Sequence, residues 1–380
     1  MAFNITNLVN AINAKSATVG ADSALDKAVL LASNVKNALI YSSLVDLPTA
    51  DSSNQGDLVR IGSSFGADTN YYVSHRDRWN LIDLSDTGAI AVGQYRPFQG
   101  TNYGFTAGGS SNIIEKFPFA SDDDATDVGD LTSAGTAAAG AQSSATHGYA
   151  TDFTCNINKF SFTSNGNATD IGSLTAAFYA PGGGQSSATH GYVAGGLFQY
   201  INKFPFSADG NATSVGSLIE SRKTCAGQTD AVNAFGYVSG GSTNSVVRNS
   251  IEKISFSTDG NATDVGDVTE GRFYTTGQSS STHGYTTGGQ NGFSGPTLST
   301  NSDRIDKFSF ANGGNATDVA NLLEGKHANM AGHSSTASGY TSGGSPTTYQ
   351  IEKFPFSTDA NSTDVADLTS SRTYTSGTQY

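Results

Sequence analysis

Four basic residues recur at one position of a repeated sequence and could bind an anionic ligand. Each follows the phrase Asp-Val-Gly-Asp-Leu or a near variant, and the four are Arg222, Arg272, Lys326 and Arg372. The two earlier copies have Gly135 and Phe178 at this position. Neighbouring cations on one face would suit an acidic ligand such as a charged polysaccharide. The alternative is that each cation packs within the repeat and has a structural role.

These residues belong to a repeat that covers about three quarters of the chain. The phrase Ile-x-Lys-Phe-x-Phe occurs six times, with Ile254 in place of the first Phe in the fourth copy. Successive copies begin 43, 44, 50, 54 and 46 residues apart, a period that is typical of propeller blades. The copies are residues 114–119, 157–162, 201–206, 251–256, 305–310 and 351–356.

Each repeat contains four short β-like runs separated by Gly, Asn, Asp and Ser turns, which we name strands a to d in chain order. Strand a is Gly-rich, strand b contains the phrase Gly-aromatic-x-x-Gly-Gly, strand c is the Ile phrase and strand d contains Asp-Val-Gly-Asp. The first repeat begins at strand b, and residues 373–380 form a strand a without followers. The C-terminal strand can therefore complete blade 1 and remove the exposed edges, although residues 89–94 are a rival for that position.

The repeat resembles the kelch family of β-propellers. In that family strand b ends in a double glycine, strand c carries aromatic residues and an Arg follows strand d. Gly195-Gly196, Phe204, Phe206 and Arg222 match these features, whereas the Trp that the family has in strand d is missing from all six copies. The resemblance implies a mainly β fold, a six-bladed kelch-like β-propeller, and an Arg that packs against the blade.

Variable connections between strands b and c are the candidate binding surface. In an up-and-down blade they lie on the same face as the d–a connections, and they differ in every repeat, whereas the c–d turns are nearly identical. Variable loops on a rigid scaffold commonly carry binding function, although drift on an unused surface is the alternative. The candidate binding residues are Phe198, Tyr200, Arg248, Phe293 and Tyr349.

Two further patterns could carry chemistry. His147, His190 and His283 precede strand b in three repeats, so they would diverge round a ring, and we interpret them as turn residues and not as metal ligands. Residues 257–263 are similar to the Asp box of six-bladed sialidases, but the Gly comes one place early and no catalytic acid or Tyr–Glu pair stands out. We expect no catalytic residues, no metal and no cofactor.

Composition narrows the possible partners. The net charge is −13 with only 20 Lys and Arg, which argues against binding to a nucleic-acid backbone or an anionic membrane surface. No apolar run approaches the ~20 residues that cross a bilayer, so we expect no membrane insertion. The two cysteines, Cys155 and Cys225, lie in different repeats and are interpreted as packing residues.

The first hundred residues have a different pattern. Residues 1–43 are predicted to be helical, with a narrow apolar stripe that must pack within its own domain, against another copy of the chain or against a larger assembly. Residues 44–88 are predicted to form a small β-meander with strands at 56–61, 70–74 and 78–82. The predicted stripe consists of Leu25, Val29, Ala32, Val35 and Leu39.

The meander resembles a hairpin module of tailed-bacteriophage appendage proteins. The resemblance rests on Asp46-Leu47-Pro48-Thr49-Ala50, a Gly-Asp-Leu-Val strand, an aromatic strand and an Arg-Trp-Asn-Leu phrase. It implies a virion location, with residues 1–43 docking or oligomerising, residues 44–88 forming the module and residues 89–380 forming the propeller.

We therefore expect a non-enzymatic bacteriophage structural protein, a tail or capsid appendage that forms a homo-oligomer. Its partners would be other virion proteins, through the N-terminal region, and a host-surface polysaccharide or protein, through the propeller. The alternatives are a sialidase-like glycan-processing enzyme and a decoration protein without a receptor.

Overall fold

The computed structural model divides the chain into two compact units, Met1–Tyr95 and Arg96–Tyr380. In the first unit it describes strand residues 39–41, 58–61, 70–74, 79–83 and 91–93. In the second unit it describes residues 99–380 apart from 134–137, 153, 176–181, 197, 232, 293–299, 328–329 and 347–348. Among the described residues the fold is mainly β.

The described part of the first unit is a five-stranded sheet in the order β1-β2-β3-β4-β5. Strand β1 pairs in parallel with β2, and the other pairs are antiparallel. The three strands expected for the meander are present as β2, β3 and β4. The strands are β1 (Leu39–Tyr41), β2 (Leu58–Ile61), β3 (Asn70–Ser74), β4 (Trp79–Asp83) and β5 (Ala91–Gly93).

Two expectations for this unit change. The apolar spacing places Leu39 at the end of a helical stripe, but Leu39 lies in strand β1, opposite Val59 of β2, so the helix does not extend that far. The other predicted stripe residues lie outside the described residues. Residues 91–93, a rival for the closing strand of the propeller, form β5 and pair with β4, so the division between units falls after residue 95 and not after residue 88.

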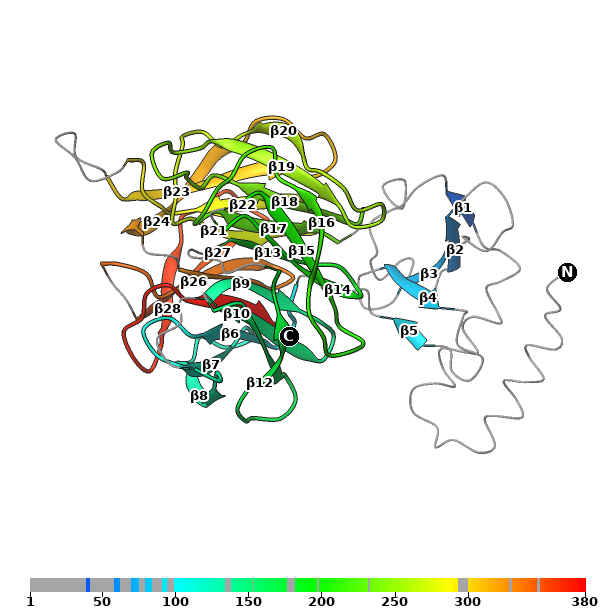
Figure 1. Cartoon of the computed structure of the whole chain (residues 1–380), viewed down its shortest axis with the longest axis horizontal. Coiled ribbons are helices and arrows are strands. Elements are labelled where there is room, and N and C mark those ends of the chain that lie inside the picture. The colour runs from blue at the N-terminus through cyan, green and yellow to red at the C-terminus, as the bar shows by residue number, and fades with distance from the viewer. Residues whose placement is uncertain are drawn as a thin grey trace, which may run out of the picture. The chain divides into compact units, whose positions relative to one another are not determined.

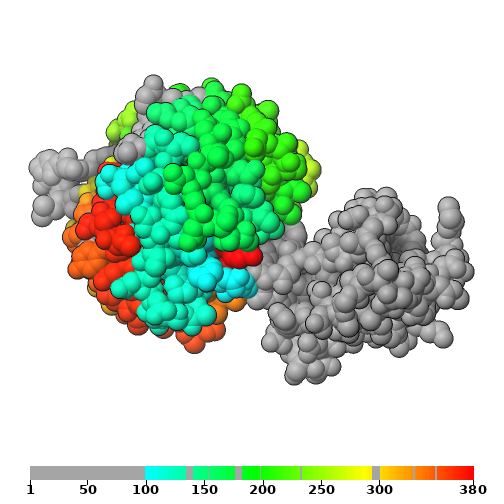
Figure 2. All heavy atoms as spheres, turned by 90° about the horizontal axis from the view of Figure 1, so that it is seen from below, coloured from blue at the N-terminus to red at the C-terminus, as the bar shows by residue number. Residues whose placement is uncertain are grey.

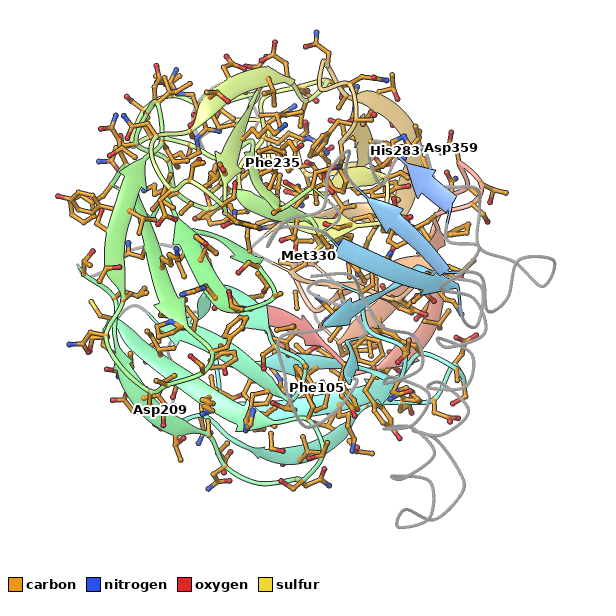
Figure 3. The ribbon with its side chains drawn as sticks, turned by 90° about the vertical axis from the view of Figure 1, so that its right-hand side faces the viewer. Phe105, Asp209, Phe235, His283, Met330 and Asp359 are labelled. Carbon is orange, nitrogen blue, oxygen red and sulfur yellow. The ribbon has the colours of Figure 1, made fainter. Side chains whose placement is uncertain are left out.

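The described part of the second unit contains six four-stranded antiparallel sheets, the blades of a propeller (Figure 1). Within each blade the strands follow one another in the order a, b, c, d. Each strand a contacts strand a of both neighbouring blades, which closes a ring of six inner strands. Figure 3 shows the blades around this centre, with Met330 near it and Asp209 and Asp359 towards the rim.

The first three blades each contain strands a, b, c and d, in that order. Blade 1 consists of β29 (Ser376–Gln379), β6 (Tyr103–Ala107), β7 (Ile113–Pro118) and β8 (Thr126–Asp130). Blade 2 consists of β9 (Ala138–Ser143), β10 (His147–Asp152), β11 (Asn156–Ser161) and β12 (Thr169–Ser173). Blade 3 consists of β13 (Gly183–Ser186), β14 (His190–Ala194), β15 (Tyr200–Pro205) and β16 (Thr213–Ser217).

The remaining three blades have the same order. Blade 4 consists of β17 (Ala226–Asp230), β18 (Phe235–Ser239), β19 (Ser250–Ser255) and β20 (Thr263–Asp267). Blade 5 consists of β21 (Thr276–Ser279), β22 (His283–Thr287), β23 (Ser302–Ser309) and β24 (Thr317–Lys326). Blade 6 consists of β25 (Ala331–Ser334), β26 (Ser338–Ser342), β27 (Gln350–Pro355) and β28 (Thr363–Asp367).

The C-terminal strand closes the ring, as the order of the repeats predicted. Strand β29 pairs antiparallel with β6, with Ser376 opposite Ala107 and Gln379 opposite Gly104. Figure 2 shows the red C-terminal residues against the cyan residues that follow residue 100. Because the last strand of the chain belongs to the first blade, no blade in the described ring is left with an unpaired strand a.

The Phe-x-Phe part of the repeated phrase builds the core between blades. In blade 3 the rings of Phe204 and Phe206 lie 5.5 and 4.8 Å from the ring of Tyr149 in blade 2. Within blade 3, a Cβ at Gly191 would lie only 2.4 Å from the Phe204 ring, so strand b needs glycine there. The prolines of the phrase, such as Pro205, are the last residues of their strands, where a residue without a backbone N–H is tolerated.

Candidate functional site

The four repeated cations are buried between blades and paired with carboxylates, which corrects their interpretation as a binding arc. Each reaches the second residue of the Ile phrase in the next blade, and all four side chains are 0% exposed. A cation in this position cannot meet a ligand on the surface, so the packing alternative is what the structure shows. The pairs are Arg222 with Glu252, Arg272 with Asp306 (2.6 Å), Lys326 with Glu352 (2.7 Å) and Arg372 with Glu115.

The ion pairs are extended by hydrogen bonds to the double glycine of strand b. Arg222 donates through Nη1 to the carbonyl oxygens of Gly240 and Ser250, each at 3.1 Å. Arg272 likewise donates to the carbonyl oxygen of Gly288 at 2.9 Å. Burial raises the pKa of Glu252, and Arg222 opposes this shift. The cation therefore joins the end of strand d to strands b and c of the following blade.

The two junctions without a cation also lack the carboxylate at the second position of the Ile phrase. The buried carboxylate of Asp152, beside Asn158, is held by hydrogen bonds instead. Asn158 and Asn202 replace the acid in blades 2 and 3, following the blades whose cation position holds Gly135 and Phe178. Asn202 Oδ1 accepts hydrogen bonds from the backbone N–H and hydroxyl of Thr175, at 3.0 and 2.6 Å. An unpaired buried carboxylate would be costly, so its loss together with the cation is expected. This paired change in the sequence was the signal that could have identified the ion pairs.

The lysine of the phrase forms a second set of contacts at the rim. In five of the six copies it reaches the c–d turn of the next blade, as where Lys159 lies 2.9 Å from Asp209 and Lys307 lies 2.8 Å from Asp359. The Asn of the same turn bonds to the preceding blade. Asn211 Oδ1 accepts a hydrogen bond from the backbone N–H of Ser173 at 2.9 Å. Contacts between blades therefore explain why the Lys of the phrase and the Asn of the c–d turn are repeated.

Each of the three repeated histidines is the first residue of its strand b, directly after the a–b turn. Each donates or accepts one hydrogen bond through Nδ1 with the hydroxyl of the preceding Thr, at 2.8 Å in all three cases. Burial lowers the pKa of each imidazole, and a nearby Lys lowers it further. The described residues contain no group of three or more His, Cys, Asp or Glu side chains that could hold a metal ion. The three histidines are His147, His190 and His283.

A closed circle of hydrogen bonds surrounds the propeller axis. One backbone N–H in each strand a donates to a side-chain oxygen in strand a of the next blade, over 2.9 to 3.4 Å, and the last returns to the first. The order is Ser143, Ser186, Thr229, Ser279, Ser334, Gln379 and back to Ser143. The C-terminal strand thus closes the circle as well as the blade.

The axis also holds a cavity, which is small. It is lined by residues in or beside strand a of the blades, among them Gly184, Cys225, Thr276 and Met330, and its volume is about 70 Å³. Pockets for small molecules usually measure about 300–1,000 Å³. The axial cavity therefore has room for a few water molecules and is not the best candidate for a binding site.

Exposed aromatic residues are found on the variable b–c loops. Phe198 and Tyr200 are 37% and 41% exposed, and their rings stack with centroids 5.5 Å apart and an interplanar angle of 26°. Tyr349 of blade 6 is 46% exposed. Arg248 forms an ion pair with Glu220 of the preceding blade. Phe293 lies outside the described residues.

Phe198 and Tyr200 have an exposed aliphatic neighbour that the sequence did not single out. Ile219 is 50% exposed, and its carbonyl oxygen accepts a hydrogen bond from Gln199 Nε2 at 2.9 Å. The position usually holds Thr, whose hydroxyl bonds the next blade, as Thr175 and Thr269 do. Departure from the repeat at this position is the signal that identifies Ile219. We call Phe198, Tyr200 and Ile219 the blade 3 patch.

No protein-family model matches the chain, and no curated protein sequence matches it either. In the part of the chain that the structure describes, no helix is long and apolar enough to span a bilayer.

Proposed function

We propose that the chain is a non-enzymatic structural protein of a bacteriophage virion, a tail or capsid appendage whose propeller attaches to the host surface. One observation carries this proposal: the repeated polar residues bind neighbouring blades, while the loops that do not repeat expose aromatic side chains. Exposed aromatic clusters on a rigid scaffold are characteristic of binding surfaces.

The kelch-like character of the blades is part of the proposal. Gly195 and Gly196 have φ angles of 95° and 82°, and Gly196 N–H donates to the carbonyl oxygen of Arg222 at 2.8 Å. The double glycine and the Arg after strand d, which are residues that carry the resemblance, thus contact each other within blade 3. This contact supports kelch-like blades, although the family's Trp is missing from strand d.

The burial of the repeated carboxylates favours a binding function over glycan processing. Glu115, Glu252, Asp306 and Glu352 are buried and paired with a cation in the neighbouring blade. A general acid or nucleophile has to reach the substrate, and these four carboxylates do not reach the surface. Release of reducing sugars from the host envelope by the purified protein would instead support the sialidase-like alternative.

The resemblance of residues 44–88 to a phage hairpin module supports the virion location, with the N-terminal region contacting other virion proteins and a second copy of the chain. Mass spectrometry of purified virions tests this assignment. We expect peptides of the chain to co-purify with infectious particles through a density gradient. Their presence in the lysate but not in the particles would contradict it.

A further inference from the structure

We infer that the blade 3 patch is a stacking platform for an uncharged sugar of the host surface. This inference rests on the proposed attachment function and specifies the ligand class and the residues that bind it. The platform consists of the stacked rings of Phe198 and Tyr200. Ile219, whose carbonyl oxygen is bonded by the intervening Gln199, follows in the adjoining segment, and the next residue, Glu220, pairs with Arg248.

The two rings are held in place before any ligand arrives. Tyr200 is the first residue of β15 and pairs with Ser217 of β16. Gln199 lies between the two aromatic residues. Its backbone carbonyl oxygen accepts a hydrogen bond from the backbone N–H of Leu218 at 2.7 Å, and its side-chain Nε2 donates to the carbonyl oxygen of Ile219 at 2.9 Å. Because the loop is tied to the end of strand d, binding would cost little conformational entropy.

The shape and chemistry of the platform suit a pyranose ring. Phe198 lies at the bend just before β15, and its ring stacks on that of Tyr200, the first residue of the strand. Aromatic faces carry partial negative charge, and the C–H groups on one face of a sugar carry partial positive charge. A stacked pair that remains about two-fifths exposed gives a sugar an apolar surface to lie on.

The charges around the platform favour a neutral ligand. Glu220 and Arg248 are 44% and 29% exposed and pair with each other across blades 3 and 4, so their charges cancel. The repeat cation of blade 3, Arg222, is buried against Glu252. Sugar hydroxyls can donate to Glu220 and accept from Arg248, whereas a carboxylate or sulfate would have to compete with Glu220 for Arg248 and cannot reach the buried Arg222.

The test measures binding of the full-length protein to an array of bacterial surface polysaccharides, neutral and acidic, and to host cells. We expect binding to neutral polysaccharides, reduced at least tenfold by Phe198→Ala or Tyr200→Ala and little changed by Tyr200→Phe, which keeps the ring. Leu323→Ala is the matched control, because Leu323 occupies the position of Ile219 in blade 5 and is 52% exposed. Thermal unfolding of each variant verifies that the fold is intact.

Two results would overturn the inference. Host-cell binding that the alanine variants retain, or that is directed to acidic polysaccharide or protein, would contradict the platform while leaving attachment in place. Failure of the wild type to bind either host cells or the array would contradict the attachment function as well.

Discussion

The junctions between blades and the b–c loops respond differently to sequence change. At the junctions the residues change together: Arg272 occurs with Asp306, whereas Phe178 occurs with Asn202. In the loops, Phe198 and Tyr200 have no counterparts in other blades and are not enclosed by them. Burial explains the difference, because an unmatched charge is costly between blades but tolerated at the surface. Junction variants should therefore affect stability, and loop variants should affect binding.

The largest expected effect is at the junction of blades 4 and 5. Arg272→Phe leaves Asp306 buried without its cation, and Asp306→Asn leaves Arg272 without its anion. Each single variant should lower the free energy of unfolding by about 3–5 kcal/mol, as measured by chemical denaturation.

The double variant Arg272→Phe/Asp306→Asn copies the residues of the natural junction between blades 2 and 3. Thr269, which donates to Asp306 at 2.7 Å, can then bond the new Asn as Thr175 bonds Asn202. We expect the double variant to be more stable than either single variant. Additive losses would contradict the idea that the two residues changed as a pair.

A smaller, pH-dependent effect is expected at the axis. Strand a carries a buried Gln in blades 2 to 5, but His333 in blade 6, where burial lowers its pKa from 6.5 to about 4. Between these values the unfolded chain binds a proton that the folded chain does not, so stability should fall as pH drops from 6.5 to 4. The loss should reach up to about 3 kcal/mol and level off below pH 4.

His333→Gln copies blades 2 to 5 and tests this directly. Because Gln does not titrate, the variant should lose less stability than the wild type between pH 6.5 and 4, measured by urea denaturation at each pH. Identical pH profiles for the two proteins would show that another group causes the acid sensitivity.

The smallest junction effect is expected at the rim. Lys159 and Asp209 are partly exposed, so water and salt weaken their attraction. Lys159→Ala should cost less than about 1 kcal/mol, and the difference from wild type should shrink further in high salt. If Lys159→Ala lowered the free energy of unfolding as much as Arg272→Phe, solvent exposure would not explain the difference between the ion pairs at the rim and those in the interior.

The blade count, the strands of each blade and the closing strand could be predicted because the phrase Ile-x-Lys-Phe-x-Phe and its neighbours repeat along the chain. The role of Arg222 could not be settled in the same way, because a cation after strand d is compatible with a surface or a buried position. Its partner Glu252 lies in the next repeat, and only the fold brings the two together. Leu39 fits a helix by spacing alone, but pairing with Val59 places it in a strand.

The sequence identified the loops that carry the candidate site, but it did not show which side chains in them stack or remain exposed. Phe198 and Tyr200 were identified because their loop departs from the repeat, but their stacking depends on the bend just before β15. Ile219 was missed because it follows a strand d that otherwise keeps the pattern. The repeat usually has Thr at this position, but the 50% exposure of Ile219 becomes evident only in the folded structure.

Host-cell binding by the Phe198→Ala/Tyr200→Ala double variant tests the central claim most directly, with its free energy of unfolding measured on the same preparation. The account predicts that the variant stays folded and loses most of its binding, while its stability falls by only about 1–2 kcal/mol through loss of the stacked pair. Wild-type binding by a folded double variant would contradict the claim that the non-repeating loops carry the function.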